Sequence, residues 1–240
     1  MPACSTSPSV SVIVVSLNAA STIDATLDSI IAAFKVDNHH KLELILVDGG
    51  SQDGTIGRVE ARRHQIACLK IIHQTSRGIG AARNQGIAAA TSSLIGFCDA
   101  DDAWTHDAIT LKCEALYQTP SAWGVTGKVS FRTVDGDKSA AHARRCPGSE
   151  HLGYTPGALL MHHKIFSMVG PFDNSLRIGA DSDWIMRAVQ LLGPPLMIPQ
   201  TVLEKGLRPG SLSTDVITYR REMMMIARRF IGRARHKVDP

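Results

Sequence analysis

The sequence predicts an α/β fold with a mostly parallel central sheet and helices on both of its faces. Short apolar runs rich in valine, isoleucine and leucine recur along the first hundred residues, as expected of strands that are buried on both faces. Helical patterns separate these runs, which is typical of β-α-β units with right-handed crossovers. In open sheets of this kind, ligands bind beyond the carboxyl ends of the strands.

Each expected element of the first half follows from local patterning. The expected strands cover residues 10–17, 42–47, 68–72 and 94–98. The first expected helix begins after Ser21, which can cap it. Two more helices are expected at 53–64 and 81–90, and the glycine-bearing turn at 77–80 precedes the second of these. Strand and helix alternate throughout.

The second half changes character. Helices are expected at 105–117, 164–169, 181–192 and 217–235, strands at 123–132, 157–162 and 196–203, and a polar loop at 133–150. No internal repeat and no linker rich in proline, glycine and serine interrupts the chain. We therefore expect a single domain over residues 1–214, followed by a basic helix in 215–240.

The composition is that of an ordinary globular protein, with 44% hydrophobic and 20% charged residues among 240. No apolar run approaches the ~20 residues of a membrane span. The first residues lack the pattern of a signal peptide, so we expect a cytoplasmic protein. Five scattered cysteines without a CxxC pair favour free thiols over disulfides or a zinc site.

The net charge of +4 is concentrated at the end of the chain. Seven basic residues crowd the last 21, namely Arg220, Arg221, Arg228, Arg229, Arg233, Arg235 and Lys237. The apolar side of the same expected helix comprises Met223, Met224, Ile226, Ala227 and Phe230. Such a helix suits a peripheral contact with the inner membrane face, a homodimer interface, core packing, or a solvated basic face. No aromatic residues alternate with the basic ones, which argues against binding nucleic acid.

Three carboxylates follow the expected strand 94–98 within four residues: Asp99, Asp101 and Asp102. Charges at the mouth of a buried strand are costly unless a cation neutralises them. Mg²⁺ or Mn²⁺ is suited to carboxylate ligands and leaves positions for phosphates. The simpler alternative is an acidic loop that caps the helix beginning near Thr105. Asn18 and Asp48 stand at the ends of two other expected strands, which favours a site at this edge.

Six blocks of sequence resemble family 2 glycosyltransferases of the GT-A fold, the fold of nucleotide-diphospho-sugar transferases. They occur in the family's order at residues 11–18, 46–55, 78–86, 99–102, 170–173 and 180–184. The resemblance extends over about residues 9–214. It implies a nucleotide-binding half at 9–104 and an acceptor and catalytic half at 105–214. It also implies an inverting hexosyltransferase that moves a sugar from a nucleotide diphosphate to an acceptor hydroxyl, with a glycan, lipid-linked or cell-envelope acceptor.

The block at 99–102 stands where the family has its DxD motif. The resemblance makes Asp101 the direct ligand of Mn²⁺ or Mg²⁺ and assigns Asp99 to the ribose, the metal or its waters, with Ala100 between them. The cation would stabilise charge on the departing diphosphate. Asp102 is either an outer partner of this site or the cap of the next helix.

Asp181 matches the position of the family's general base, which an acceptor hydroxyl requires as a poor nucleophile. A helix N-terminus favours the ionised form of a carboxylate there. Asp181 as a simple N-cap is the alternative, and Asp183 is the rival base. Family members usually have Glu immediately before this Asp, whereas this chain has Ala180, which bears on acceptor contacts.

Asp48 stands where the family reads the nucleobase of a UDP-, dTDP- or GDP-sugar, or else it serves the turn that follows. The resemblance also places Asn18, Arg83 and Asn84 near the donor. Arg208 stands where the family often has His and would act as a clamp on the diphosphate. Lys205 and Ser211 are weaker candidates from the same stretch.

Two other functions fit parts of the sequence. A sugar nucleotidyltransferase would need a glycine-rich basic loop after the first strand, and residues 16–21 contain neither glycine nor a basic residue. A non-catalytic nucleotide-binding protein of the same fold is compatible with Ala180. The histidine pairs at 39–40 and 162–163 are expected to be surface or hydrogen-bonded side chains, since neighbouring residues on a strand point to opposite faces.

Overall fold

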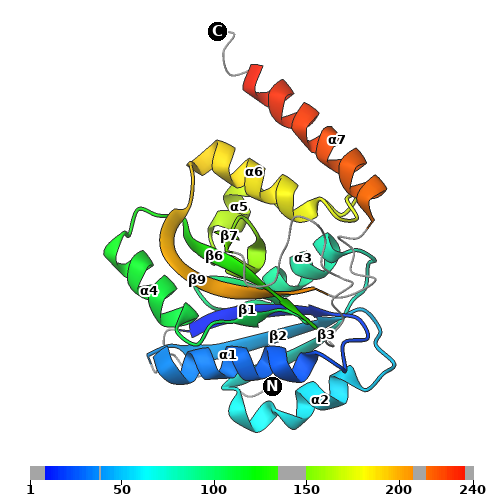
Figure 1. Ribbon diagram of the computed structural model, residues 1–240, viewed down its shortest axis with the longest axis vertical. Coiled ribbons are helices and arrows are strands. Elements are labelled where there is room, and N and C mark those ends of the chain that lie inside the picture. The colour runs from blue at the N-terminus through cyan, green and yellow to red at the C-terminus, as the bar shows by residue number, and fades with distance from the viewer. Residues whose placement is uncertain (1–8, 38, 135–149, 208–214, 236–240) are drawn as a thin grey trace.

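A nine-stranded sheet organises the computed structural model, which describes residues 9–37, 39–134, 150–207 and 215–235 (Figure 1). The strand order is β3-β2-β1-β4-β8-β6-β9-β5, and the short strand β7 pairs with β6. The first four strands are parallel, and the sheet becomes mixed where β8 enters antiparallel to β4. The expected α/β architecture with a mostly parallel sheet is confirmed.

The parallel part consists of the four strands expected from the first half. They are β1 (Ser9–Ser16), β2 (Lys41–Asp48), β3 (Cys68–His73) and β4 (Leu94–Asp99). The register pairs Ser16 with Asp48 and Val15 with Asp99, so these carboxylates lie on either side of the end of β1.

The second part of the sheet contains β5 (Ala103–Trp104), β6 (Gly124–Thr133), β7 (His151–Leu152), β8 (Leu160–His162) and β9 (Leu196–Leu207). Strand β9 runs parallel to β6, and β5 pairs with it antiparallel. The strand expected at 157–162 is shorter than predicted. A 3-10 turn over Pro156–Ala158 precedes it, because proline cannot donate to a strand ladder.

Helices cover both faces of the sheet (Figure 1). On one face lie α1 (Ile23–Asp37), α2 (Thr55–Ala61) and α4 (Ala108–Gln118). On the other lie α3 (Ile79–Ala89), α5 (Ile165–Val169) and α6 (Ala180–Leu192), with α7 (Val216–Arg235) packed outside α6. Helix α4 starts three residues later than expected, behind Asp107 as its N-cap residue.

Strand β1 shows why the sheet is apolar on both sides. Val10, Val12 and Val14 belong to the core beneath α1 and α4, whereas Ile13 belongs to the core beneath α3 and α6. All four side chains are fully buried. Alternation along a strand therefore supplies both cores from one continuous apolar run.

The basic helix α7 forms as expected, but its apolar side is not as predicted. Ile226 is buried and Met223 packs against the core under α6, whereas Met224 is 59% exposed. Met224 and Ala227 lie on the outward side of the helix, so part of the predicted apolar stripe faces away from the body. Within the described residues, no helix has the length and apolarity to cross a bilayer.

Candidate active site

The carboxyl ends of β1, β2 and β4 meet at one edge, and the acidic cluster of Asp99, Asp101 and Asp102 lies there. Asp99 ends β4 and remains 26% exposed. Its Oδ1 accepts a hydrogen bond from Arg83 Nη2 at 2.9 Å, and its Oδ2 lies 3.4 Å from Lys205 Nζ. Burial alone would raise the pKa of Asp99, but the charges of Arg83 and Lys205 outweigh burial and lower it. Asp99 is therefore an ionised carboxylate held between two cations.

Asp102 faces inward from the same cluster. Only 1% of its side chain is exposed, its Oδ2 lies 3.1 Å from Lys205 Nζ, and its Oδ1 accepts the Gly206 N–H at 2.9 Å. Burial, together with the charges of Asp99 and Asp101, raises its pKa. Asp102 thus anchors β9 to the cluster, and it does not cap α4, whose N-cap residue is Asp107.

Gly206 permits this close approach of β9 to the acidic cluster. A Cβ atom built on Gly206 would lie 2.2 Å from the Asp101 carbonyl oxygen, so a side chain there would displace the strand. The neighbouring Lys205 has its pKa raised because Asp102, Asp99 and Asp101 outweigh the effect of burial. Lys205 is therefore a cation held between Asp99 and Asp102.

Arg83 connects the acidic cluster to the predicted base. It lies on α3, is almost fully buried, and forms an ion pair through Nη1 with Asp181 Oδ1 while Nη2 binds Asp99. Its guanidinium carbon lies 5.7 Å from the ring centres of both Phe97 and Phe172. The two rings restrain the guanidinium, so Asp99 and Asp181 are brought to the same cation from β4 and α6.

Asp181 occupies the first turn of α6, as the sequence predicted, and its side chain is 26% exposed. The rival, Asp183, is buried and pairs instead with Arg187 Nε at 2.8 Å. Ala180 is fully buried against Gly80 of α3, where their Cβ positions would be 3.4 Å apart. The position that carries Glu in the family is here part of the α3–α6 packing.

Asp48 is occupied with the turn that follows β2. Its Oδ2 accepts the N–H groups of Gly50 and Ser51 at 2.9 and 2.7 Å, and its Oδ1 accepts the hydroxyls of Ser16 and Ser51 at 2.8 and 2.6 Å. These bonds lower its pKa below the ordinary value although burial acts in the opposite direction. The nucleobase contact stays a prediction, and the observed contacts make Asp48 the organiser of the 49–51 turn.

Asn18 extends the same turn. It has a positive φ of 48°, and its Oδ1 accepts the Gln52 N–H at 2.9 Å while its own N–H donates to Ser51 Oγ at 2.8 Å. Ala100 contributes through its backbone, because its carbonyl accepts the Thr22 hydroxyl at 2.7 Å while its side chain is buried. Both residues hold the loops around the edge of the sheet.

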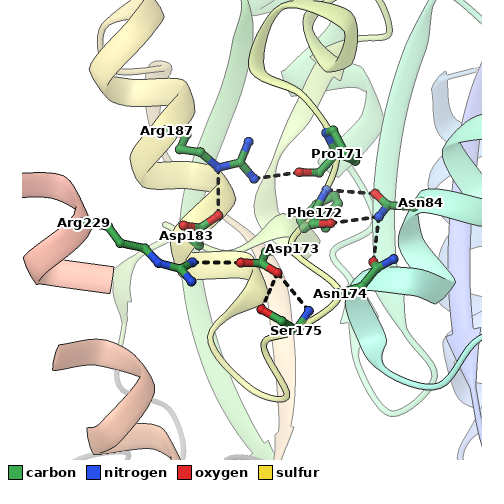
Figure 2. Close-up of a pocket in the computed structure, with 9 residues that line it drawn as sticks. All are labelled: Asn84, Pro171, Phe172, Asp173, Asn174, Ser175, Asp183, Arg187 and Arg229. Atoms are coloured by element: carbon green, nitrogen blue, oxygen red, sulfur yellow. Dashed lines mark hydrogen bonds and ion pairs between the residues drawn. The ribbon is translucent and has the colours of Figure 1, made fainter. Parts of the chain in front are cut away.

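Asn84 lines a cleft beside the 170–175 loop (Figure 2). Its Oδ1 accepts the Phe172 N–H and its Nδ2 donates to the Phe172 carbonyl, both at 2.9 Å, with a further bond to Asn174. The cleft has a volume of about 560 Å³ and is lined by Asn84, Pro171, Phe172, Asp173, Asn174, Ser175, Asp183, Arg187 and Arg229. Asn84 therefore positions the 170–175 loop, and a donor contact stays a prediction.

The residues at the end of β4 fit a hard divalent cation. Asp99 and Asp101 are both partly exposed carboxylates, with Arg83 and Lys205 beside Asp99, whereas Asp102 is buried and bound to Lys205 and Gly206. The Asp101 carbonyl accepts Arg132 Nη2 at 3.0 Å, which fixes the backbone between them. Oxygen donors of this type suit Mg²⁺ or Mn²⁺. Asp101 and Asp99 are the residues that would hold the ion, and metal binding there stays a prediction.

One set of three potential metal ligands among the described residues lies elsewhere, at the opposite end of β2. Asp37, His40 and Cys113 have ligand atoms within 4.8 Å of one another. Asp37 Oδ2 already accepts the His40 N–H and approaches its Nδ1, at 2.8 and 2.9 Å. These contacts close the end of α1, and we assign this set to the structure of the fold.

Two residues were underestimated from the sequence alone, and two of the sequence-based candidates lie outside the described residues. Lys205 was a weak candidate, yet it binds two of the three carboxylates. Glu222 was not singled out, although it is the one acidic residue in the basic stretch 216–235. That isolation was the available signal. Arg208 and Ser211 lie outside the described residues.

Comparisons with known proteins identify the family of the chain. The family model described as "Glycosyl transferase family 2" matches residues 11–171. The PGL/p-HBAD biosynthesis glycosyltransferase of Mycobacterium bovis is 31% identical over 185 residues, which cover 75% of this chain and 69% of that protein. An uncharacterized glycosyltransferase of Nostoc sp. is 32% identical over 129 residues, and the match covers 53% of this chain but only 38% of that protein.

Solved structures show the same fold. Residues 1–349 of S. aureus TarS in complex with UDP-GlcNAc superpose with a TM-score of 0.70 at 18% identity, covering 86% of this chain and 61% of that one. The mannosyltransferase PcManGT of Pyrobaculum calidifontis, in complex with GDP-Man and Mn²⁺, gives a TM-score of 0.69 at 22% identity, covering 97% and 66%. The sheet is thus that of GT-A proteins. Because the family model matches more than half of the chain, the chain belongs to glycosyl transferase family 2.

Proposed function

We propose that the protein is an inverting, metal-dependent glycosyltransferase that moves a sugar from a nucleotide diphosphate to an acceptor hydroxyl. The observation that carries this proposal is the pairing of Arg83 with both Asp99 and Asp181. It brings the acidic end of β4 and the carboxylate at the start of α6 into one site. Carboxylates that can hold a cation beside the leaving diphosphate and a base beside the acceptor, on separate elements, are what this displacement at a sugar carbon requires.

In this proposal Asp181 accepts the proton of the acceptor hydroxyl as that oxygen attacks the sugar. When bound at Asp101 and Asp99, Mg²⁺ or Mn²⁺ would supply positive charge for the oxygens of the departing diphosphate. Arg83 binds Asp181 and Asp99 through different nitrogen atoms and so fixes the orientation of both carboxylates. Lys205 neutralises negative charge at Asp99 and Asp102. Asn18 and Asp48 shape the 49–51 turn beside which we place the nucleoside.

We place a UDP-, dTDP- or GDP-sugar in the donor site. Two structural neighbours are described with UDP-GlcNAc and with GDP-Man and Mn²⁺, which supports the donor class without choosing among its members. A glycan or lipid-linked hydroxyl of the cell envelope is the proposed acceptor, and α7 suggests a cytoplasmic protein held peripherally at the inner membrane face. Association of two chains through α7 is the alternative use of that helix.

The test measures release of the nucleoside diphosphate from a panel of UDP-, dTDP- and GDP-sugars with Mn²⁺, Mg²⁺ or EDTA. We expect activity with one nucleotide class and its loss in EDTA and in Asp101→Asn. Removing a general base should lower kcat by roughly 10²–10⁴-fold in Asp181→Asn. The Asp181→Asn variant should still bind the donor, measured as a rise in melting temperature when donor is added.

The matched control is Asp183→Asn, because Asp183 lies two residues away on α6 and pairs with Arg187 on the opposite side of the helix start. We expect its kcat to stay within about tenfold of the parent protein. Equal losses in both variants would remove the base assignment from Asp181. Donor binding without any turnover would favour the non-catalytic alternative, and formation of a nucleotide sugar from a nucleoside triphosphate would favour the nucleotidyltransferase.

A further inference from the structure

Glu222 of α7 binds the turn that leads into the catalytic helix. Its carboxylate is buried and accepts three consecutive backbone N–H groups, from Arg177 and Ile178 at 2.9 Å and from Gly179 at 2.7 Å. Asp181 follows two residues after this turn. Hydrogen bonds to a charged acceptor are among the stronger ones in proteins, so this contact restrains the backbone just before Asp181.

The packing around this turn leaves little freedom. A Cβ atom on Gly179 would lie 2.7 Å from Ile226 Cδ1 and 3.0 Å from Met223 Cε, so α7 rests directly on the backbone before α6. Arg229 adds an ion pair with Asp173 at 2.8 Å on the neighbouring loop (Figure 2). Hydrogen bonds, apolar packing and an ion pair therefore all join α7 to the segment that carries the base.

The outer side of α7 has a different character. Ile217 and Met224 are 83% and 59% exposed, and Arg220, Arg221 and Arg228 are exposed between and beside them. In the described part of the chain, none of these three arginines forms an ion pair with a carboxylate. Apolar side chains flanked by arginine on one helical face match the surface of a bilayer that contains anionic phospholipid.

We propose that α7 is a membrane-binding helix whose docking controls the catalytic base: contact of its outer face with anionic phospholipid holds α7 on the body, and Glu222 then fixes the 177–179 turn that places Asp181. This inference rests on the proposed function for the role of Asp181. Glu222 is a positioning residue in it and touches neither substrate.

The physical basis is a difference in affinity between two states of α7. A helix of 20 residues that contacts the body along one side gains part of its stability from that contact. A lipid surface that binds α7 only when it is helical and docked shifts the population toward the docked state. A molecule whose α7 leaves the body would lose the Glu222 contacts, and the start of its α6 would then not be fixed.

The experiment compares the parent protein with Glu222→Gln and with a triple variant, Arg220→Gln, Arg221→Gln and Arg228→Gln. Glu60→Gln is the control, since Glu60 is an exposed acidic residue on α2 that pairs with Arg63. Each protein is mixed with vesicles of phosphatidylcholine alone or with added phosphatidylglycerol. Vesicle binding, kcat, donor KM and hydrogen exchange of the amides at 177–179 are measured.

For the parent protein we expect binding to the anionic vesicles, a rise in kcat of about threefold or more, and slower exchange at 177–179. The triple variant should keep its kcat in solution and lose both the binding and the rise. Glu222→Gln should still bind vesicles but show a kcat about tenfold lower, an unchanged donor KM, and fast exchange at 177–179 with or without lipid.

Two results would overturn the inference: equal kcat and exchange in Glu222→Gln and the parent, or binding of the parent to anionic vesicles with no change in kcat or exchange. The exchange measurement does not depend on turnover. If no donor supports transfer, the proposed function fails, while protection of the 177–179 amides by vesicles still decides whether α7 and the turn are coupled.

Discussion

Lys112 is a buried cation outside the candidate site. Its side chain is fully buried on α4, its Nζ lies 4.0 Å from the centre of the Trp104 ring, and within the described residues Nζ has no hydrogen-bond partner. Burial lowers its pKa from 10.5 to about 8. Leaving such a group without a hydrogen bond costs on the order of 1–3 kcal/mol, and the cation–π contact with the Trp104 ring offsets this cost only in part.

We therefore expect Lys112→Met to raise the free energy of unfolding at pH 7 by about 1 kcal/mol. Between pH 8 and 10.5 the unfolded parent chain keeps the Lys112 proton and the folded chain does not, so the stability of the parent rises with pH in that window. Urea titrations of both proteins at pH 7 and pH 10 check this. A constant difference between them at the two pH values would contradict it.

Single residues also show the limit of sequence reasoning. Asp99, Asp101 and Asp181 could be chosen from short motifs, because each motif keeps its residues within a few positions. Lys205 could not be ranked correctly, since the carboxylates it neutralises lie 103 and 106 positions earlier and only the β9 register brings them together. Glu222 was hidden for the same reason, because its partners at 177–179 lie more than 40 positions away.

At the scale of elements, α3 is pressed against the sheet through glycine. A Cβ atom on Gly86 would lie 2.4 Å from Ile13 Cγ2, whereas a Cβ atom on Gly57 of α2 would meet nothing within 4 Å. Both glycines are inside helices, where alanine is intrinsically favoured by roughly 0.5–1 kcal/mol. The two positions thus separate packing from helix propensity.

We expect Gly86→Ala to destabilise the protein by about 1–3 kcal/mol, because Ile13 or α3 must move. Gly57→Ala should stabilise it by about 0.5–1 kcal/mol. Thermal unfolding of the two variants beside the parent is the measurement. Similar changes in stability in the two variants would mean that Ile13 and α3 can move apart at little cost in free energy.

Elements were predicted where the pattern was long and were missed where it was short. The four parallel strands and α7 follow from runs that periodicity can detect. Strands β5 and β7 contain two residues each, and no local pattern distinguishes so short a strand from a turn. Strand β9 extends past the predicted end to Leu207, because its backbone continues to pair with β6 although the polar Glu204 and Lys205 interrupt the apolar pattern.

At the scale of the whole molecule, Glu43 ties several segments together. Its buried carboxylate binds Lys70 Nζ at 2.6 Å and Thr91 at 2.7 and 2.9 Å, and also accepts the Ser11 hydroxyl, so it joins β1, β2, β3 and the entry to β4. Burial would raise its pKa, but Lys70 and the hydroxyl and backbone donors lower it from 4.5 to about 2. Its ionised form therefore stabilises the fold.

Because folding lowers the pKa of Glu43, acid is expected to weaken the fold. The contribution of Glu43 is complete above pH 4.5 and is lost as the pH falls toward about 2. We expect Glu43→Gln to lower the free energy of unfolding at pH 7 by about 2–3 kcal/mol and to flatten its decline between pH 4.5 and 2. Chemical denaturation across this range, with the exposed Glu60→Gln as control, tests it, and an unchanged acid profile in Glu43→Gln would refute it.

Fold class, family and the acidic edge were predictable because they depend on patterns repeated along the chain. The turns around Asp48 and Asn18 and the burial of Ala180 depend on three-dimensional contacts and required the structure. The two cations that hold Asp99 come from distant parts of the chain, Arg83 before it and Lys205 106 positions after it. During synthesis on a ribosome, the acidic end of β4 therefore emerges long before its second counter-ion. A nascent or prematurely terminated polypeptide lacking β9 would leave Asp99 and Asp102 without Lys205, so the charges at this end of β4 have both counter-ions only after translation has passed residue 205.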